Sequence, residues 1–212
     1  MLRWDVDLLA LSAHKLGGPM GAGALYVRKG LALTPLLHGG GHERGGRSGT
    51  ENVAGVAGMA AALRESAEHL RENTRHVTAM RDRLIEGLSA IPYSHLTGDP
   101  VNRLPGSVSF VFECVEGESL VLGLDMHGVC ASSGSACSSG SLDTSHVLLA
   151  IGLPHEIAHG SLRLTLSGHN TMEEIEYLIQ QVAGAVRRGR EMSPLWDAVG
   201  QKPTERFWKA EN

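Results

Sequence analysis

Short apolar runs in the first thirty residues give way to a helical repeat further along the chain. Val6–Ser12 is a short apolar run, typical of a buried strand, and Ala24–Arg28 indicates a second strand after a turn rich in glycine and proline. From residue 51 to about residue 90, apolar side chains recur at intervals of three and four. This repeat predicts one long helix, or two helices with a break near Asn73-Thr74, that connects two domains.

The second half of the chain carries strand and helix signals in turn, which is typical of a compact α/β unit. Residues 91–105 are expected to form a loop, and the tail after Met192 is expected to be irregular. Thr171 and Glu174 have the spacing of a capping box at the start of the last helix. Strands are expected at Ser107–Phe112 and Gly160–Ser167, and helices at Gly117–Met126, at Ser145–Ile151 and from Thr171 to about Arg188.

Composition and charge narrow the class of protein. The chain has 212 residues, 42% of them hydrophobic, and a net charge of −4, which argues against a general nucleic-acid binder. The sequence contains neither a signal peptide nor an apolar run of about 18 residues that could span a membrane. Cys114, Cys130 and Cys137 form no C-x-x-C motif, so neither a structural zinc site nor a disulfide framework is indicated. We therefore expect a cytoplasmic protein with no nucleic-acid or membrane partner.

The first predicted strand ends in residues suited to chemistry. It delivers His14 and Lys15 to a glycine-rich loop, and α/β folds build sites in this way beyond strand ends. Lys15 is a candidate Schiff-base lysine, because a deprotonated lysine amine can attack a carbonyl group. The alternative is an ordinary solvated lysine at a strand end.

A second polar segment, residues 37–50, contains six glycines among fourteen residues and cannot form a regular element. Its backbone N–H groups and arginines suit an anion such as phosphate, although the P-loop motif is absent. A metal site built from His38, His42 and Glu43 is the alternative, but these residues lack the spacing of a known metal motif. We predict no metal.

A third segment, Ala131–Ser141, consists of small side chains around a single thiol, Cys137. Glycine and serine keep such a backbone loose, so the reactivity of the thiol matters more than its packing. The alternative is a flexible linker that happens to contain a cysteine.

These three segments together resemble one known family. L-S-A-H-K-L-G-G-P-M-G-A-G, H-G-G-G-H-E-R-G-G-R-S-G-T-E-N and C-A-S-S-G-S-A-C-S-S-G-S follow one another in this order. In order and spacing they resemble the cysteine desulfurases of the NifS/IscS type, in the class V aminotransferase group of fold-type I pyridoxal-phosphate enzymes. The resemblance extends from about residue 5 to about residue 190, and the length of the cysteine segment resembles the long-loop branch.

The resemblance implies a pyridoxal 5′-phosphate site in the first fifty residues. Lys15 would hold the cofactor covalently and later move protons, and His14 would share the catalytic site. Ser12 and His14 match positions that bind the cofactor phosphate. Thr50 matches a residue that reaches the phosphate of the neighbouring subunit in a dimer.

The resemblance also implies the sulfur chemistry. Cys137 would be the nucleophile that takes the sulfur of L-cysteine as a persulfide, and Arg163 would bind the substrate carboxylate, a task suited to a bidentate guanidinium. The persulfide would then pass to an acceptor protein, either an iron–sulfur scaffold or a tRNA-thiolation enzyme. Cys114 and Cys130 are expected to be structural.

The implied fold is α/β and incomplete. Residues 1–50 would be the remnant of a cofactor-binding large domain, residues 51–90 a connecting helix, residues 91–190 a small C-terminal α/β domain, and residues 191–212 a tail. The chain resembles only the second half of the family, so the groups that hold the pyridine ring are missing. We therefore expect an internal start, a cloning boundary or half of a split gene, and either a homodimer or pairing with an N-terminal half.

Three functions follow from these expectations. The first is a cysteine desulfurase polypeptide that needs its missing half. The second is a non-catalytic sulfur carrier or interaction module built around Cys137. The third is another class V lyase, such as a selenocysteine lyase.

Overall fold

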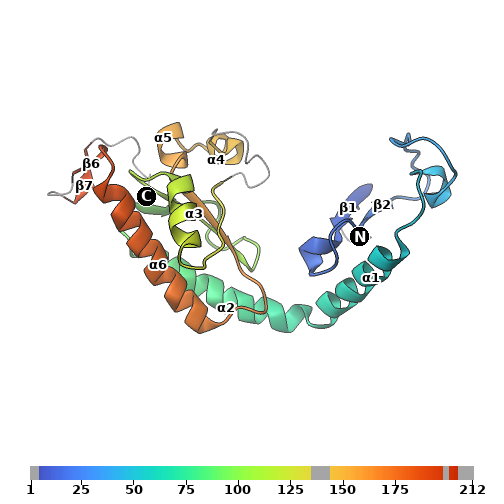
Figure 1. Cartoon of the computed structure of the whole chain (residues 1–212), viewed down its shortest axis with the longest axis horizontal. Coiled ribbons are helices and arrows are strands. Elements are labelled where there is room, and N and C mark those ends of the chain that lie inside the picture. Colours follow the sequence, from blue (N-terminus) through green and yellow to red (C-terminus); the bar gives the residue numbers. More distant parts are fainter. Residues whose placement is uncertain (1–4, 135–143, 198–200, 205–212) are drawn as a thin grey trace. The chain divides into compact units, whose positions relative to one another are not determined.

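The computed structural model describes residues 5–134, 144–197 and 201–204 of the chain. The chain divides into two compact units, residues 1–71 and residues 72–212 (Figure 1). Within the described ranges, no helix combines the length and the apolar character needed to cross a lipid bilayer.

The first unit is a strand pair packed against one helix. Strand β1 (Leu8–Ser12), the 3₁₀ helix η1 (Ala13–Leu16) and strand β2 (Gly23–Val27) form an antiparallel hairpin. Helix α1 (Val53–Glu68) begins at Asn52, whose side chain accepts a hydrogen bond from the Gly55 N–H.

The second unit is built on a three-stranded antiparallel sheet. Strands β3 (Ser94–Leu96), β4 (Ser107–Phe112) and β5 (Ser161–Thr165) lie in that order. Val108 lies opposite Leu164, and Ser109 lies opposite Arg163. Apolar residues thus share one face of the sheet, and the other face is polar except at Val111.

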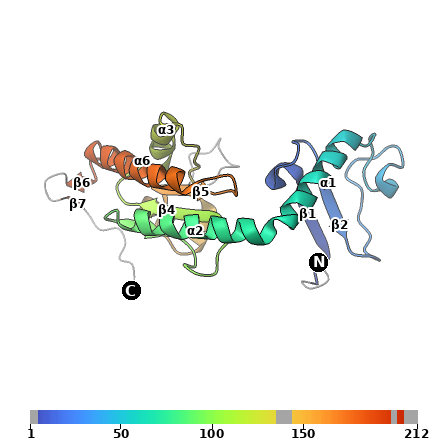
Figure 2. The same cartoon turned by 90° about the horizontal axis from the view of Figure 1, so that it is seen from below.

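Three helices cover the apolar face of this sheet (Figure 2). They are α2 (Leu70–Ser89), α3 (Gly117–Asp125) and α6 (Met172–Glu191). Thr171 caps α6 in a capping box with Glu174, as the sequence predicts. The core contains residues of all three helices and both long strands: Met80, Leu84, Leu88, Val108, Phe110, Phe112, Leu120, Leu124, Leu162, Leu164, Ile175, Val182 and Val186.

Among the described residues, two short helices pack on the opposite face of the sheet at one end. Two short helices, α4 (His146–Ala150) and α5 (His155–Ala158), pack a small apolar cluster against Val111 of β4. Arg163 of β5 also lies on this face and remains exposed.

Three predictions about secondary structure need correction. The helical segment is interrupted at His69, before the predicted position, and Asn73 lies inside α2, where its side chain packs close to Gly168. Strand β3 lies within the predicted loop 91–105, where three residues suffice because β4 supplies the hydrogen-bonding partners. The tail contains a short strand pair, β6 (Trp196–Asp197) and β7 (Lys202–Pro203).

A buried arginine fixes the start of this tail. Arg190 is 5% exposed, and its guanidinium donates hydrogen bonds to the carbonyl oxygens of Glu113 at 3.0 Å and Tyr93 at 3.1 Å. The same group lies 4.4 Å from the ring centre of Trp196, which suits a cation–π contact. The end of α6, the end of β4 and the tail are therefore joined through one side chain.

Cys114 lies beside the contacts that Arg190 makes. Its backbone is left-handed, with φ of 65°, and its thiol donates a hydrogen bond to the Leu195 carbonyl at 3.1 Å. Burial raises the pKa of the Cys114 thiol above its ordinary value of 9.0; Glu113 raises it further, while Arg190 lowers it. Cys130, in contrast, is exposed, which does not fit the structural role expected for it.

Replacing Arg190 with lysine should destabilise the second unit by about 1–3 kcal/mol, because one ammonium cannot donate to both carbonyl oxygens while covering the Trp196 ring. Urea unfolding measures the loss. Arg187→Lys, at an exposed position of the same helix, is the matched control. Equal free energies of unfolding for the two variants would contradict this role of Arg190.

Alkylation of Cys114 should depend on pH with a midpoint above 9.0, because a raised pKa lowers the thiolate fraction at any given pH. The rate is measured by iodoacetamide labelling and peptide mass spectrometry, with the exposed Cys130 as the internal reference. Steric shielding would slow labelling at every pH without moving the midpoint. A midpoint at or below 9.0 is the opposing result.

Candidate functional site

The turn that carries Lys15 is shaped by small residues. Ala13 is fully buried, its N–H donates to the Ala22 carbonyl at 2.9 Å, and its own carbonyl accepts from the Gly18 N–H at 2.9 Å. Gly17 ends η1 with φ of 77°, a left-handed conformation that glycine adopts without strain. The chain therefore reverses tightly between β1 and β2 and leaves His14 and Lys15 on the outside.

Helix α1 supports this turn. A Cβ atom at Gly18 would lie 3.2 Å from Cβ of Ala62, so the turn and the helix approach each other closely. The Ser66 hydroxyl donates to the Leu16 carbonyl at 3.4 Å. Of the predicted cofactor residues, Ser12, His14 and Lys15 are all exposed here. No hydrogen bond or ion pair engages the Lys15 amine among the described residues.

The glycine-rich segment 37–50 folds on itself through its own backbone. The Ser48 hydroxyl donates to the Gly40 carbonyl at 3.1 Å, and Arg47 donates to the Gly49 carbonyl at 2.9 Å. Nδ1 of His42 is buried and has no hydrogen-bond partner within the described ranges. Thr50 is exposed just before the N-terminal cap of α1. The His38, His42 and Glu43 alternative gains no support, because the described residues contain no group of three or more potential metal ligands.

In the second unit, Arg163 is paired with the start of the serine-rich segment. Ser132 and Arg163 form an antiparallel bridge in which the Arg163 N–H donates to Ser132 at 2.7 Å and the Ser132 N–H donates back at 3.1 Å. Gly134 also donates its N–H to the Ser161 hydroxyl at 3.1 Å. Residues 132–134 therefore continue the sheet beyond β5, on the side opposite β4.

The other end of the segment is held as well. The Oγ1 atom of Thr144 lies 3.1 Å from Nε2 of His155 in α5, which is hydrogen-bond distance. Ser145, at the start of α4, is 5% exposed. A Cβ atom at Gly134 would lie 2.7 Å from Cβ of Ser145, which only glycine avoids. Gly134 and Ser145, which flank residues 135–144 in the chain, therefore lie next to each other. Cys137 lies between them, outside the described residues.

The site residues expected from the sequence thus fall into two groups. Ser12, His14, Lys15 and Thr50 belong to the first unit, and Arg163 belongs to the second. Sequence reasoning missed Ser132, Gly134, Ser161 and Thr144, which hold the ends of the cysteine segment. Ser132 and Gly134 lie at the start of the segment of small residues, Thr144 follows it and Ser161 lies in β5, and contacts of that kind leave no motif.

Known proteins resemble this chain over most of its length. Residues 1–178 match the family model of aminotransferase class-V proteins. The cysteine desulfurase IscS of Methanosarcina thermophila is 51% identical over 191 residues, and the cysteine desulfurase NifS of Azotobacter vinelandii is 44% identical over 197 residues. These matches cover 90% and 92% of the chain, but only 47% and 49% of the relatives, so the chain spans about half the length of the curated relatives it matches.

A solved structure shows the same fold. The NifS-like protein from Rickettsia africae ESF-5 is 31% identical, with a TM-score of 0.78, over 86% of this chain and 48% of its own. The predicted α/β class is confirmed, and so is the resemblance to NifS-like and IscS-like proteins. Because the family model matches residues 1–178, which is most of the chain, the chain belongs to the aminotransferase class-V family.

Proposed function

We propose that this chain is part of a cysteine desulfurase, which converts L-cysteine to L-alanine and leaves the sulfur as a persulfide on Cys137. The observation that carries the proposal is the bridge between Ser132 and Arg163, because it ties the cysteine segment to the candidate carboxylate-binding residue. The names of the curated relatives support it at 44–51% identity.

The short stretch of chain between Ser132 and Cys137 supports the proposal that Cys137 and Arg163 act on the same substrate molecule. Cys137 follows Ser132 by five residues, so their Cα atoms can lie at most roughly 18 Å apart. Ser132 and Arg163 are directly paired across the bridge, which corresponds to about 5.5 Å between Cα atoms. A thiol on such a tether can meet a substrate held by the arginine and can also turn toward an acceptor.

The sulfur transfer that we propose is balanced without a further oxidant. The Cys137 thiolate attacks the sulfur of L-cysteine, a sulfur–sulfur bond forms, and the bond between that sulfur and the substrate β-carbon breaks. The β-carbon gains a proton and becomes the methyl group of alanine, while the Cys137 sulfur is oxidised to the persulfide. Arg163 would hold the substrate carboxylate through two parallel hydrogen bonds.

Residues of the first unit fit one end of pyridoxal 5′-phosphate. Lys15 offers an amine without a partner among the described residues, and Ser12 and His14 offer exposed polar groups next to it. The buried Nδ1 of His42, which has no hydrogen-bond partner among the described residues, would suit a polar group of a further polypeptide. When bound, the cofactor would supply an electron sink for the carbon skeleton of the substrate. Lys15 would bind it covalently and move protons at its own nitrogen.

The first unit presents an apolar surface that a further polypeptide should cover. Only Ala13, Gly55 and Met59 are buried among its described residues. Large apolar side chains are exposed on both strands and on α1, for instance Leu25, Val53 and Val56. A two-stranded hairpin is marginal by itself. We therefore propose that residues 1–50 complete a cofactor-binding large domain together with an N-terminal half, with residues 91–190 as the small domain.

Further features of the family complete the proposal. Thr50 would reach the cofactor phosphate of a neighbouring subunit in a dimer. The acceptor of the sulfur would be an iron–sulfur scaffold or a tRNA-thiolation enzyme that meets the Cys137 persulfide.

In a complex with an N-terminal half of a class V relative, added pyridoxal 5′-phosphate should give a visible absorbance band that Lys15→Ala removes, because the covalent bond needs this amine. Lys29→Ala, at another exposed lysine of the same unit, should keep the band. A band that persists in Lys15→Ala, or that both variants lose, would argue against the assignment of Lys15.

In the same complex, Cys137→Ser should reduce persulfide formation and alanine release from L-cysteine to background, because a hydroxyl cannot accept the sulfur. Cys130→Ser, at an exposed thiol seven residues earlier in the chain, should keep both. Mass spectrometry of the labelled persulfide and an alanine assay provide the measurements.

The same assay separates the alternatives. Release of alanine without a persulfide on Cys137 and a preference for selenocysteine would indicate a selenocysteine lyase. Sulfur uptake from an external donor without alanine release would indicate a carrier module. Either result would replace the proposed function.

A further inference from the structure

A row of polar residues crosses the sheet of the second unit through Arg163. In the register of the sheet, Ser109 of β4 lies directly opposite Arg163 of β5, and Ser132 lies opposite Arg163 on the other side. Just after β3, Thr97 donates its N–H to the Ser109 carbonyl at 2.9 Å and so continues the row. Residues paired in this way share a face, with Cβ atoms about 4.5–5.5 Å apart. Hydroxyl side chains therefore flank the candidate carboxylate-binding residue on both sides.

The core determines the direction of the Ser109 side chain. Val108 and Phe110, its neighbours in β4, are 0% and 1% exposed in the core, so Ser109 must lie on the opposite face, as Arg163 does. Arg163 is exposed, and its guanidinium makes no hydrogen bond or ion pair within the described ranges. Its donors are therefore available to an anion that lies on this face of the sheet.

Thr97 holds the hydroxyl of Ser109. Thr97 is 8% exposed, and its Oγ1 lies 2.7 Å from Oγ of Ser109 and 3.1 Å from the Ser109 carbonyl oxygen. A hydroxyl has one proton to donate and two lone pairs that accept. When Thr97 donates across the shorter contact, the Ser109 proton is free to point to another acceptor. An anion beside Arg163 favours this arrangement, because hydrogen bonds to charged acceptors are the stronger ones.

We propose that Ser109 is a substrate-binding residue, which donates a hydrogen bond to the carboxylate that Arg163 holds. Thr97 would be a positioning residue that acts through the Ser109 hydroxyl. The inference rests on the proposed function, from which the amino-acid substrate and the role of Arg163 are taken. Ser132 is the weaker candidate, because no hydroxyl partner among the described residues orients it in this way.

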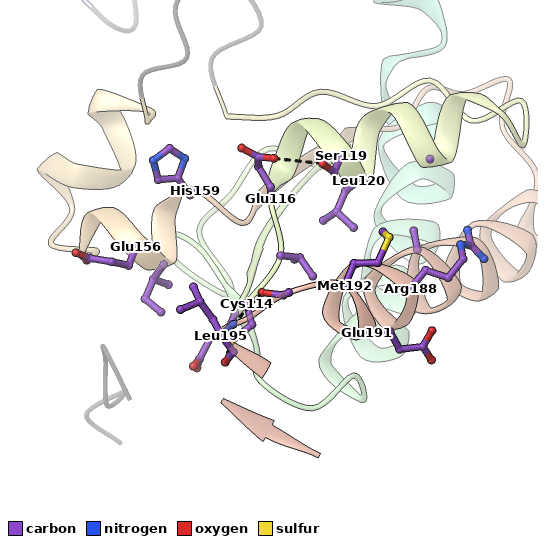
Figure 3. A pocket seen from close by; sticks show the side chains of 17 residues that line it. Cys114, Glu116, Ser119, Leu120, Glu156, His159, Arg188, Glu191, Met192 and Leu195 are labelled. Carbon is purple, nitrogen blue, oxygen red and sulfur yellow. Dashed lines mark hydrogen bonds between the residues drawn. The ribbon is translucent and has the colours of Figure 1, made fainter. Parts of the chain in front are cut away.

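The large pocket of the second unit is a poor alternative site for this carboxylate. It has a volume of about 830 Å³ and lies between β4, α3, α5 and the end of α6 (Figure 3). The exposed charged residues that line it are three carboxylates and one guanidinium: Glu116, Glu156, Glu191 and Arg188. Such a margin repels an anion. Neither Ser109 nor Arg163 lines this pocket, so the two places can be altered separately.

The test measures carboxylate binding without sulfur transfer. Calorimetric titration with L-alanine is carried out on the complex with an N-terminal half of a class V relative. Ser109→Ala should raise the dissociation constant about tenfold, because the lost hydrogen bond goes to a charged group. Ethylamine, which is alanine without its carboxylate, should bind Ser109→Ala as well as it binds the unaltered complex. Thr97→Val keeps the shape of the side chain without its hydroxyl and should weaken only L-alanine, by about threefold.

Three variants serve as controls. Ser109→Thr keeps a hydroxyl at the same position and should keep most of the affinity for L-alanine. Ser107→Ala removes a hydroxyl from the same strand and face, but opposite Thr165, and should leave the dissociation constant unchanged. Ser119→Ala removes a hydroxyl that donates to the Glu116 carboxylate at 3.2 Å in the pocket, and it should also have no effect (Figure 3).

The opposing results are distinct. An L-alanine affinity that Ser109→Ala leaves unchanged would overturn the inference, and so would equal weakening of L-alanine and ethylamine, which indicates a structural change. Absence of L-alanine binding to the unaltered complex would overturn it as well. If these titrations fail while alanine release and the Cys137 persulfide are observed, only this inference is lost. Binding that depends on Ser109 in a complex without sulfur transfer would keep the carboxylate site and contradict the proposed function.

Discussion

Alternation of side chains across the three-stranded sheet is the constraint on which the second unit depends. Leu162 and Leu164 enter the core with α2, α3 and α6, and Arg163 between them must therefore lie on the other face. A register slip of one residue would bury the guanidinium and expose both leucines. The same register determines where Ser132 can pair, because the free edge of β5 offers its hydrogen-bonding groups at Arg163.

The candidate site is supported at several fixed points in the described parts of the chain. Close packing of Ala13, Gly18 and α1 holds the turn that presents Lys15. In the second unit, Ser132 and Gly134 hold one end of the cysteine segment, and Thr144 holds the other. Under the proposed function, these fixed points on either side of Cys137 would limit how far a persulfide can lie from Arg163.

The relation to longer relatives gives the exposed surfaces a physical meaning. The second unit buries a continuous core on one side of its sheet. The first unit buries few of its described side chains and exposes leucines and valines. A chain that spans about half the length of its curated relatives should present such an unpartnered surface where the rest of the domain packs.

Local signals in the sequence determined most elements of this protein. Apolar alternation identified β4 and β5, and the Thr171–Glu174 spacing identified the start of α6, because these features depend on residues close in the chain. Three motifs together identified the family. Tertiary structure alone decided the strand β3, the bridge from Ser132 to Arg163 and the burial of Arg190. Each of these depends on backbone groups or side chains distant in sequence, which pair by position and leave no pattern of residue types to read.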